Sequence, residues 1–178
     1  GPNGAGKTTV MRLLSGLAQA TSGSIVVAGL DVIKDGRGVR EIMGVVTQND
    51  GLDNTLTVFQ NLYLYGFLAG LSKERAKERT HEVLVFFGLD DRSDANVYEL
   101  SGGMKRRLAI ARSMMKSPSV VVMDEPTTGL DPNSRNRVWE ELAILKDQGV
   151  TVVLSTHYME EAMILCDRLA IMDHGKIL

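Results

Sequence analysis

The sequence has little cysteine, no long apolar run and no excess of basic charge. Its one cysteine, Cys166, excludes an internal disulfide bond. The longest unbroken apolar stretch, Leu62–Leu71, is well short of the roughly 20 residues that a membrane-spanning helix needs, so we expect no transmembrane helix in these residues. A formal net charge of −2 and a pI near 5.9 give no basic field that would recruit nucleic acid. The composition, with 44% hydrophobic and 24% charged residues, is typical of a globular domain.

Hydrophobic periodicity and turn residues predict alternating strands and helices. Thr57 with Gln60 forms a capping box, and Asp131 before Pro132 is a second helix start. The helices are predicted at residues 7–17, 58–69, 73–87, 102–116, 132–148 and 159–166. The strands are predicted at 24–27, 44–46, 120–123 and 151–155, followed by a turn at 174–175. This alternation predicts an α/β fold, a mostly parallel sheet flanked by helices, with an α-helical sub-lobe inserted.

Two details of this pattern concern exposure. The strands 120–123 and 151–155 are apolar enough to be buried on both faces. The Lys105-Arg106-Arg107 cluster is most simply a solvated helix face, and Arg112 lies in the last helical turn, where the helix dipole favours a cation. We therefore expect no nucleic-acid partner.

The first nine residues match the phosphate-binding loop G-x-x-x-x-G-K-[ST] through Gly1, Gly6, Lys7 and Thr8. Glycines let backbone amides turn inward around a phosphate, and the following helix adds its positive N-terminal dipole. Lys7 would bridge the β- and γ-phosphates of ATP, and the Thr8 hydroxyl would ligate Mg²⁺. A flexible glycine loop is the alternative, but a full match rarely arises by chance. The predicted ATP-binding residues are Asn3, Gly4, Ala5, Gly6, Lys7, Thr8 and Thr9.

Two consecutive carboxylates follow the apolar strand 120–123. Asp124 comes at the carboxyl end of that strand, the edge at which open α/β sheets bind ligands. Asp124 can hold Mg²⁺ through water, and Glu125 can then polarise an attacking water. An exposed acidic pair before the Pro126 turn is the alternative. The phosphate loop upstream favours the catalytic interpretation.

The segment Leu100-Ser101-Gly102-Gly103-Met104 resembles the LSGGQ signature of the ATP-binding cassette (ABC) family. Ser101 and the two glycines place a hydroxyl and open amides at a helix start, which suits an anion. Alone, the segment would be a capped helix with a glycine hinge. Its place between the phosphate loop and the Asp-Glu pair makes it the most discriminating feature. Met104 departs from the family's glutamine, as in cassettes similar to daunorubicin-resistance exporter ATPases.

The resemblance covers the whole chain and implies three further site residues. Gln48 matches the glutamine that contacts Mg²⁺ or the attacking water and faces the transmembrane partner. Asp131 matches the family's D-loop, and His157 matches the switch histidine that contacts the γ-phosphate. Taken alone, these residues would be a solvated loop glutamine, a helix cap and a structural histidine.

The resemblance also implies the organisation and the role of the protein. We expect one P-loop NTPase domain, 1–178, with a RecA-like core (1–50 and 117–178) and a helical subdomain (about 51–116). Because the phosphate loop normally follows a strand, we expect the chain to lack the N-terminal strands of such a domain. Ser101, Gly102 and Gly103 of one copy would close over the ATP of a second cassette, in a homodimer bound to a membrane permease. The predicted function is Mg²⁺-dependent ATP hydrolysis for an exporter at the cytoplasmic face of the membrane. The alternatives are a soluble cassette protein of translation or chromosome maintenance, and a non-catalytic nucleotide sensor.

Overall fold

The computed structural model describes residues 1–178, which divide into two compact units. The first unit comprises residues 1–48, 119–126 and 142–178, and the second comprises 49–118 and 127–141. The chain passes from one to the other at Gln48 and again at Pro118, Pro126 and Glu141. Each unit is described by itself below. The subdomain ranges that the sequence predicts stay a prediction.

A parallel three-stranded sheet forms the centre of the first unit. Its strands run in the order β3 (Met43–Val46), β4 (Val120–Asp124) and β5 (Thr151–Ser155). Every residue of β4 is buried, as its apolar sequence predicts for a central strand. The register places Asp124 opposite Ser155, so the carboxyl ends of β4 and β5 lie side by side.

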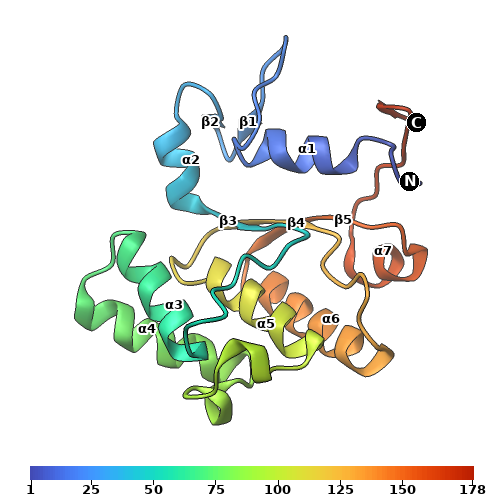
Figure 1. Ribbon diagram of the computed structural model, residues 1–178. Helices are drawn as coiled ribbons and strands as arrows, with labels where there is room; N and C mark the ends of the chain where they lie inside the picture. The colour runs from blue at the N-terminus through green and yellow to red at the C-terminus, as the bar shows by residue number, and fades with distance from the viewer. The chain divides into compact units, whose positions relative to one another are not determined.

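Helix α1 (Lys7–Leu14) lies along one face of this sheet and contacts β4 and β5 (Figure 1). It begins after Gly6, whose φ of 101° is accessible mainly to glycine. The predicted end at Leu17 is wrong, because the helix stops at Leu14. The Ser15 hydroxyl donates to the Met11 carbonyl at 2.8 Å, and Gly16 then turns the chain with a φ of 68°.

Smaller elements complete the first unit. Two antiparallel hairpins, β1 (Val26–Val27) with β2 (Leu30–Asp31) and β6 (Met172–Asp173) with β7 (Lys176–Ile177), accompany helices α2 (Gly36–Ile42) and α7 (Met159–Leu165). The predicted strand 24–27 is therefore shorter and lies outside the parallel sheet. The turn at His174-Gly175 is confirmed, with positive φ at both residues.

Strand β5 is less buried than its sequence predicts. Only Ser155 is buried, and Thr151 is exposed. Among residues 1–178, β5 pairs with β4 alone. It lines a mostly apolar hollow of about 900 Å³, together with residues of α1 and α7. Within residues 1–178 the exposure of β5 reflects this single pairing, which an apolar strand sequence does not reveal.

The second unit is helical. Helices α3 (Val58–Leu68) and α4 (Lys73–Phe86) pack against each other, and α5 (Gly102–Ser113) contacts α3 (Figure 1). The predicted capping box is confirmed: Gln60 N donates to Thr57 Oγ1 at 3.1 Å, and Thr57 N donates to Gln60 Oε1 at 2.9 Å. Two short 3-10 helices, η1 (Asp90–Arg92) and η2 (Val97–Glu99), precede α5. Helix α6 (Pro132–Asp147) begins in this unit.

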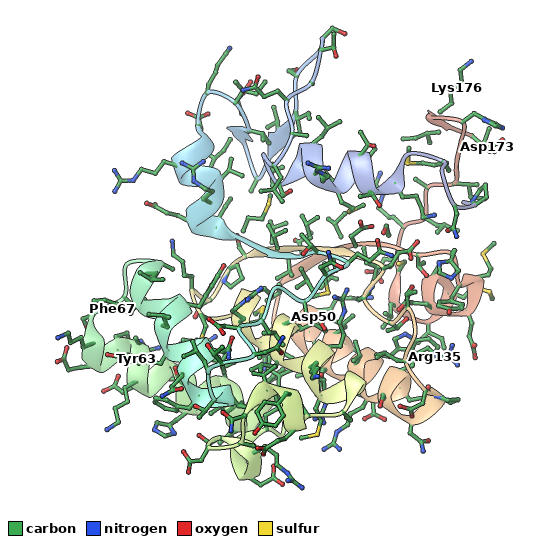
Figure 2. The ribbon with its side chains drawn as sticks, viewed as in Figure 1. Asp50, Tyr63, Phe67, Arg135, Asp173 and Lys176 are labelled. Atoms are coloured by element: carbon green, nitrogen blue, oxygen red, sulfur yellow. The ribbon has the colours of Figure 1, made fainter.

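The basic cluster on α5 is not a solvated face, so that prediction is wrong for two of its three members. Arg106 and Arg107 are only 5% and 7% exposed. Arg106 Nη1 donates to Asp50 Oδ1 at 3.1 Å, and Arg107 Nη1 donates to the Phe87 carbonyl at 2.7 Å; Asp50 is labelled in Figure 2. Arg112 lies in the last turn of α5, as predicted. Its guanidinium donates to the carbonyls of Asp50 and Gly51. Three arginines of α5 thus tie distant loops to the helix.

Candidate functional site

The first turn of α1 and the loop before it surround a small polar hollow. The loop arches through Gly4 and Gly6, which have φ values of 81° and 101°. Lys7 Nζ donates to the carbonyls of Gly1 and Pro2, at 2.9 Å each, and so lies across the inside of the arch. The hollow has a volume of about 320 Å³ and is lined by Asn3, Gly4, Gly6, Lys7, Thr8, Thr9, Gln48 and Glu125.

Glu125, the residue after β4, has a left-handed backbone conformation that the surrounding contacts stabilise. Its φ is 49°, and a non-glycine residue in this region costs about 1–3 kcal/mol. Its amide donates to the Ser155 carbonyl and to Ser155 Oγ, each at 3.1 Å. Its carboxylate Oε1 then lies 3.2 Å from His157 Nδ1 and 3.8 Å from Lys7 Nζ. The structure therefore brings three of the predicted catalytic residues together.

Asp124 is buried at the tip of β4, with 6% of its surface exposed. The Ser155 hydroxyl donates to Asp124 Oδ1, across the register that pairs these two residues. Ser155 therefore fixes both the Asp124 carboxylate and the Glu125 backbone. Ser155 is not among the site residues that the sequence predicts. Its place as the last residue of an apolar strand, two before His157, was the available signal.

The donors of this region fit a magnesium nucleotide better than a closed metal site. Residues 1–178 contain no cluster of three or more histidine, cysteine or acidic side chains placed to hold a metal ion. Mg²⁺ keeps several waters and is bound in proteins through one or two carboxylates together with substrate phosphates. Thr8 and Gln48 at the hollow and the Asp124 carboxylate supply that kind of donor set. The larger hollow beside β5 is mostly apolar, although Lys7, Ser155 and His157 also border it.

The remaining predicted residues lie in the second unit, at two helix starts. Ser101 Oγ accepts from Met104 N at 3.2 Å and caps α5, with Gly102 exposed and Gly103 buried. Asp131 Oδ1 accepts from the amides of Asn133 and Ser134 at 3.1 and 3.0 Å, which confirms the predicted helix cap. Hydrogen bonds from the Ser134 side chain and amide hold the pKa of Asp131 below its usual value.

Comparison with known proteins decides the family. Residues 1–128 match the family model described as ABC transporter. The chain belongs to the ABC transporter family. The predicted family and the P-loop α/β fold class are thereby confirmed.

Curated relatives of this cassette are named as export components. Nod factor export ATP-binding protein I of Rhizobium sp. (strain N33) is 48% identical over 176 residues, covering 99% of this chain and 58% of the relative. The protein of that name from Burkholderia orbicola (strain AU 1054) is 47% identical with the same coverage. The chain thus spans 58% of the length of these relatives.

Two solved structures share the fold. The cbiO1 protein of Clostridium perfringens, part of the ABC transporter complex cbiONQ, has a TM-score of 0.88 at 28% identity, covering 100% of this chain and 73% of that one. The ATP-binding cassette MJ0796, solved as a dimer in a post-hydrolysis state with ADP and Pi, has a TM-score of 0.85 at 26% identity, covering 99% and 80%. Within residues 1–178 no helix combines the length and the apolar character that crossing a membrane requires.

Proposed function

We propose that this cassette binds and hydrolyses Mg-ATP and powers an exporter. The observation that carries the proposal is the geometry of Glu125, whose carboxylate lies 3.2 Å from His157 Nδ1 and 3.8 Å from Lys7 Nζ at the edge of the phosphate-loop hollow. A carboxylate held beside a lysine and a histidine is suited to accept a proton from water during phosphoryl transfer. The names of the relatives, Nod factor export ATP-binding protein I, support the exporter role.

Each candidate site residue of the first unit has a role in this proposal. The loop amides and Lys7 hold the phosphates, and Lys7 exchanges its loop carbonyls for phosphate oxygens. Thr8, Gln48 and Asp124 would hold Mg²⁺, which would neutralise phosphate charge. Glu125 accepts the proton of the attacking water, and His157 orients the Glu125 carboxylate and contacts the γ-phosphate. Ser155 keeps Asp124 and Glu125 in place.

A second copy completes the site in the proposal. Ser101, Gly102, Gly103 and Asp131 of one copy bind the nucleotide that Lys7 of the other copy holds. The dimeric structure of MJ0796 with ADP and Pi supports this arrangement, since it is 26% identical and shares the fold. A membrane permease, by analogy with the complex that contains cbiO1, would hold the dimer at the cytoplasmic face of the membrane. A soluble cassette protein is the second candidate, and the export names of the relatives favour the first.

Replacement of one side chain tests the proposal. Glu125→Gln keeps the shape of the side chain and removes the base, so we expect hydrolysis to slow by about 10²–10⁴-fold. ATP should still bind and should now hold a stable dimer, measured by gel filtration with ATP. Glu160→Gln, an exposed carboxylate on α7, is the matched control and should turn over at the wild-type rate. Wild-type turnover by Glu125→Gln would remove Glu125 from this role.

A further inference from the structure

Gly103, in the first turn of α5, packs against Ser134, in the first turn of α6, so closely that position 103 has no room for a side chain. A methyl group at Gly103 would lie 2.6 Å from Ser134 Cβ and closer still to Ser134 Oγ. Real side chains do not approach that closely, so one helix would have to move. A methyl group at the neighbouring Gly102 would meet no atom within 4 Å. Packing within the chain therefore requires a glycine at 103 and leaves 102 free of that requirement.

Ser134 also contacts the carboxylate of Asp131. Its amide donates to Asp131 Oδ1 at 3.0 Å, and its side chain makes a further hydrogen bond to the Asp131 carboxylate. Ser134 thus lies between two groups, Gly103 at the start of α5 and the carboxylate that caps α6. No other residue contacts Gly103 more closely at the position of the missing side chain.

We propose that Ser134 is a positioning residue that sets the spacing between the Ser101–Gly103 tip and Asp131. The inference rests on the proposed function, in which both groups act on the nucleotide of a second copy. Two groups that must reach one ligand together need a fixed separation, and a side chain in contact with both provides it. Serine suits this place because its hydroxyl reaches Asp131 while its small size lets the Gly103 backbone approach.

The cost of disturbing the contact follows from its dimensions. A methyl group at 103 would have to move by about 1 Å to reach an ordinary carbon–carbon separation of about 3.5–4 Å. A displacement of about 1 Å can reduce a rate by roughly 10²-fold when it misplaces groups that act on the reacting centre. ATP binding to the separate copy should not change, because the phosphate loop belongs to the first unit.

A size-swap experiment in the intact protein tests the proposal. We expect Gly103→Ala to lower the kcat of ATP hydrolysis by roughly 10²-fold and to leave the affinity of the monomer for a fluorescent ATP analogue within about twofold. Adding Ser134→Gly should relieve the clash, because the next atom, Ser134 Cα, is an ordinary 3.7 Å away. It should restore the melting temperature but not kcat, because it also removes the side chain that sets the spacing. Adding Ser134→Ala should restore little, since Cβ remains. Melting temperatures of all variants separate folding from positioning.

Controls and a second variant keep the outcomes distinct. Gly102→Ala should gain nothing from Ser134→Gly, because no contact exists there to relieve. If Gly103→Ala does not fold, Ser134→Val introduces bulk at the same contact and should lower kcat by about tenfold at unchanged affinity. Full rescue of kcat by Ser134→Gly, or an unchanged kcat in Ser134→Val, overturns the proposal. A wild-type protein without ATPase activity contradicts the proposed function itself.

Discussion

Glu141 makes the stability of the second unit depend on pH. Its side chain on α6 is buried, and Arg107 Nη1 lies 3.7 Å from Oε1, while Oε2 has no hydrogen-bond partner. Burial raises the pKa of Glu141 from 4.5 to about 7, although the charges of Arg107 and Arg137 oppose the shift. Burial also lowers the pKa of Arg107. Desolvation therefore outweighs the attraction within this pair.

The magnitude and sign follow from the raised pKa. Between pH 4.5 and about 7 the folded protein binds a proton at Glu141 that the unfolded chain has released. This stabilisation is fully present below the unfolded pKa and is lost as pH rises through the folded one. A shift of about 2.5 units, at about 1.4 kcal/mol each, amounts to about 3 kcal/mol. Glu141→Gln resembles the protonated acid and does not ionise. Its advantage over wild type should rise from below about 1 kcal/mol at pH 5 to about 3 kcal/mol at pH 8.

Urea unfolding at several pH values measures this difference. Trp139, the one tryptophan, is buried on the same helix and reports on the second unit through its fluorescence. Glu140→Gln removes the same charge from an exposed neighbour and should change the free energy of unfolding by less than about 0.5 kcal/mol at every pH. A gain in Glu141→Gln that is equal at pH 5 and pH 8, or a loss at pH 8, would refute the reasoning.

Two further predictions concern α5. Arg106→Met removes the hydrogen bond from Arg106 to Asp50, whose side chain is 32% exposed. The free energy of unfolding, measured by urea titration, should fall by about 1–2 kcal/mol. An unchanged free energy would show that the contact adds nothing to stability. Ser101→Arg should abolish ATP hydrolysis and leave ATP affinity of the monomer within about twofold, measured by fluorescent nucleotide titration. A collapse of monomer affinity would mean that Ser101 acts on the ATP of its own copy.

The features that the sequence predicts well are local ones. The Thr57–Gln60 capping box, the Asp131 cap and the His174-Gly175 turn each depend on residues within three positions of one another. The glycine-rich arch before α1 belongs to this group, since Gly4, Gly6, Lys7 and Thr8 lie within five positions. Their chemistry is complete within a few residues, so no knowledge of the tertiary structure is needed.

The errors come from contacts between distant residues. The sequence around Arg106 and Arg107 has the pattern of an exposed basic face, but their partners, Asp50 and the Phe87 carbonyl, lie 56 and 20 residues away. An arginine is buried where it finds such acceptors, and nothing next to it in sequence reveals them. Exposure of a strand likewise depends on its neighbours in the sheet, and within residues 1–178 β5 has one, β4.

The candidate site depends both on local sequence and on contacts between distant residues. Asp124, Glu125 and His157 can each be placed at a strand end from sequence alone, but that does not say which ends are adjacent. The parallel register of β4 with β5 pairs Asp124 with Ser155. Glu125 and His157 then follow one and two residues beyond the paired positions, and the positive φ of Glu125 directs its carboxylate to His157 Nδ1 at 3.2 Å. A one-residue slip of β5 would separate the pair, since side chains alternate between the faces of a sheet. The geometry of the candidate site is therefore a property of strand order and register, and Ser155, which bonds to both Asp124 and Glu125, is the residue that fixes it.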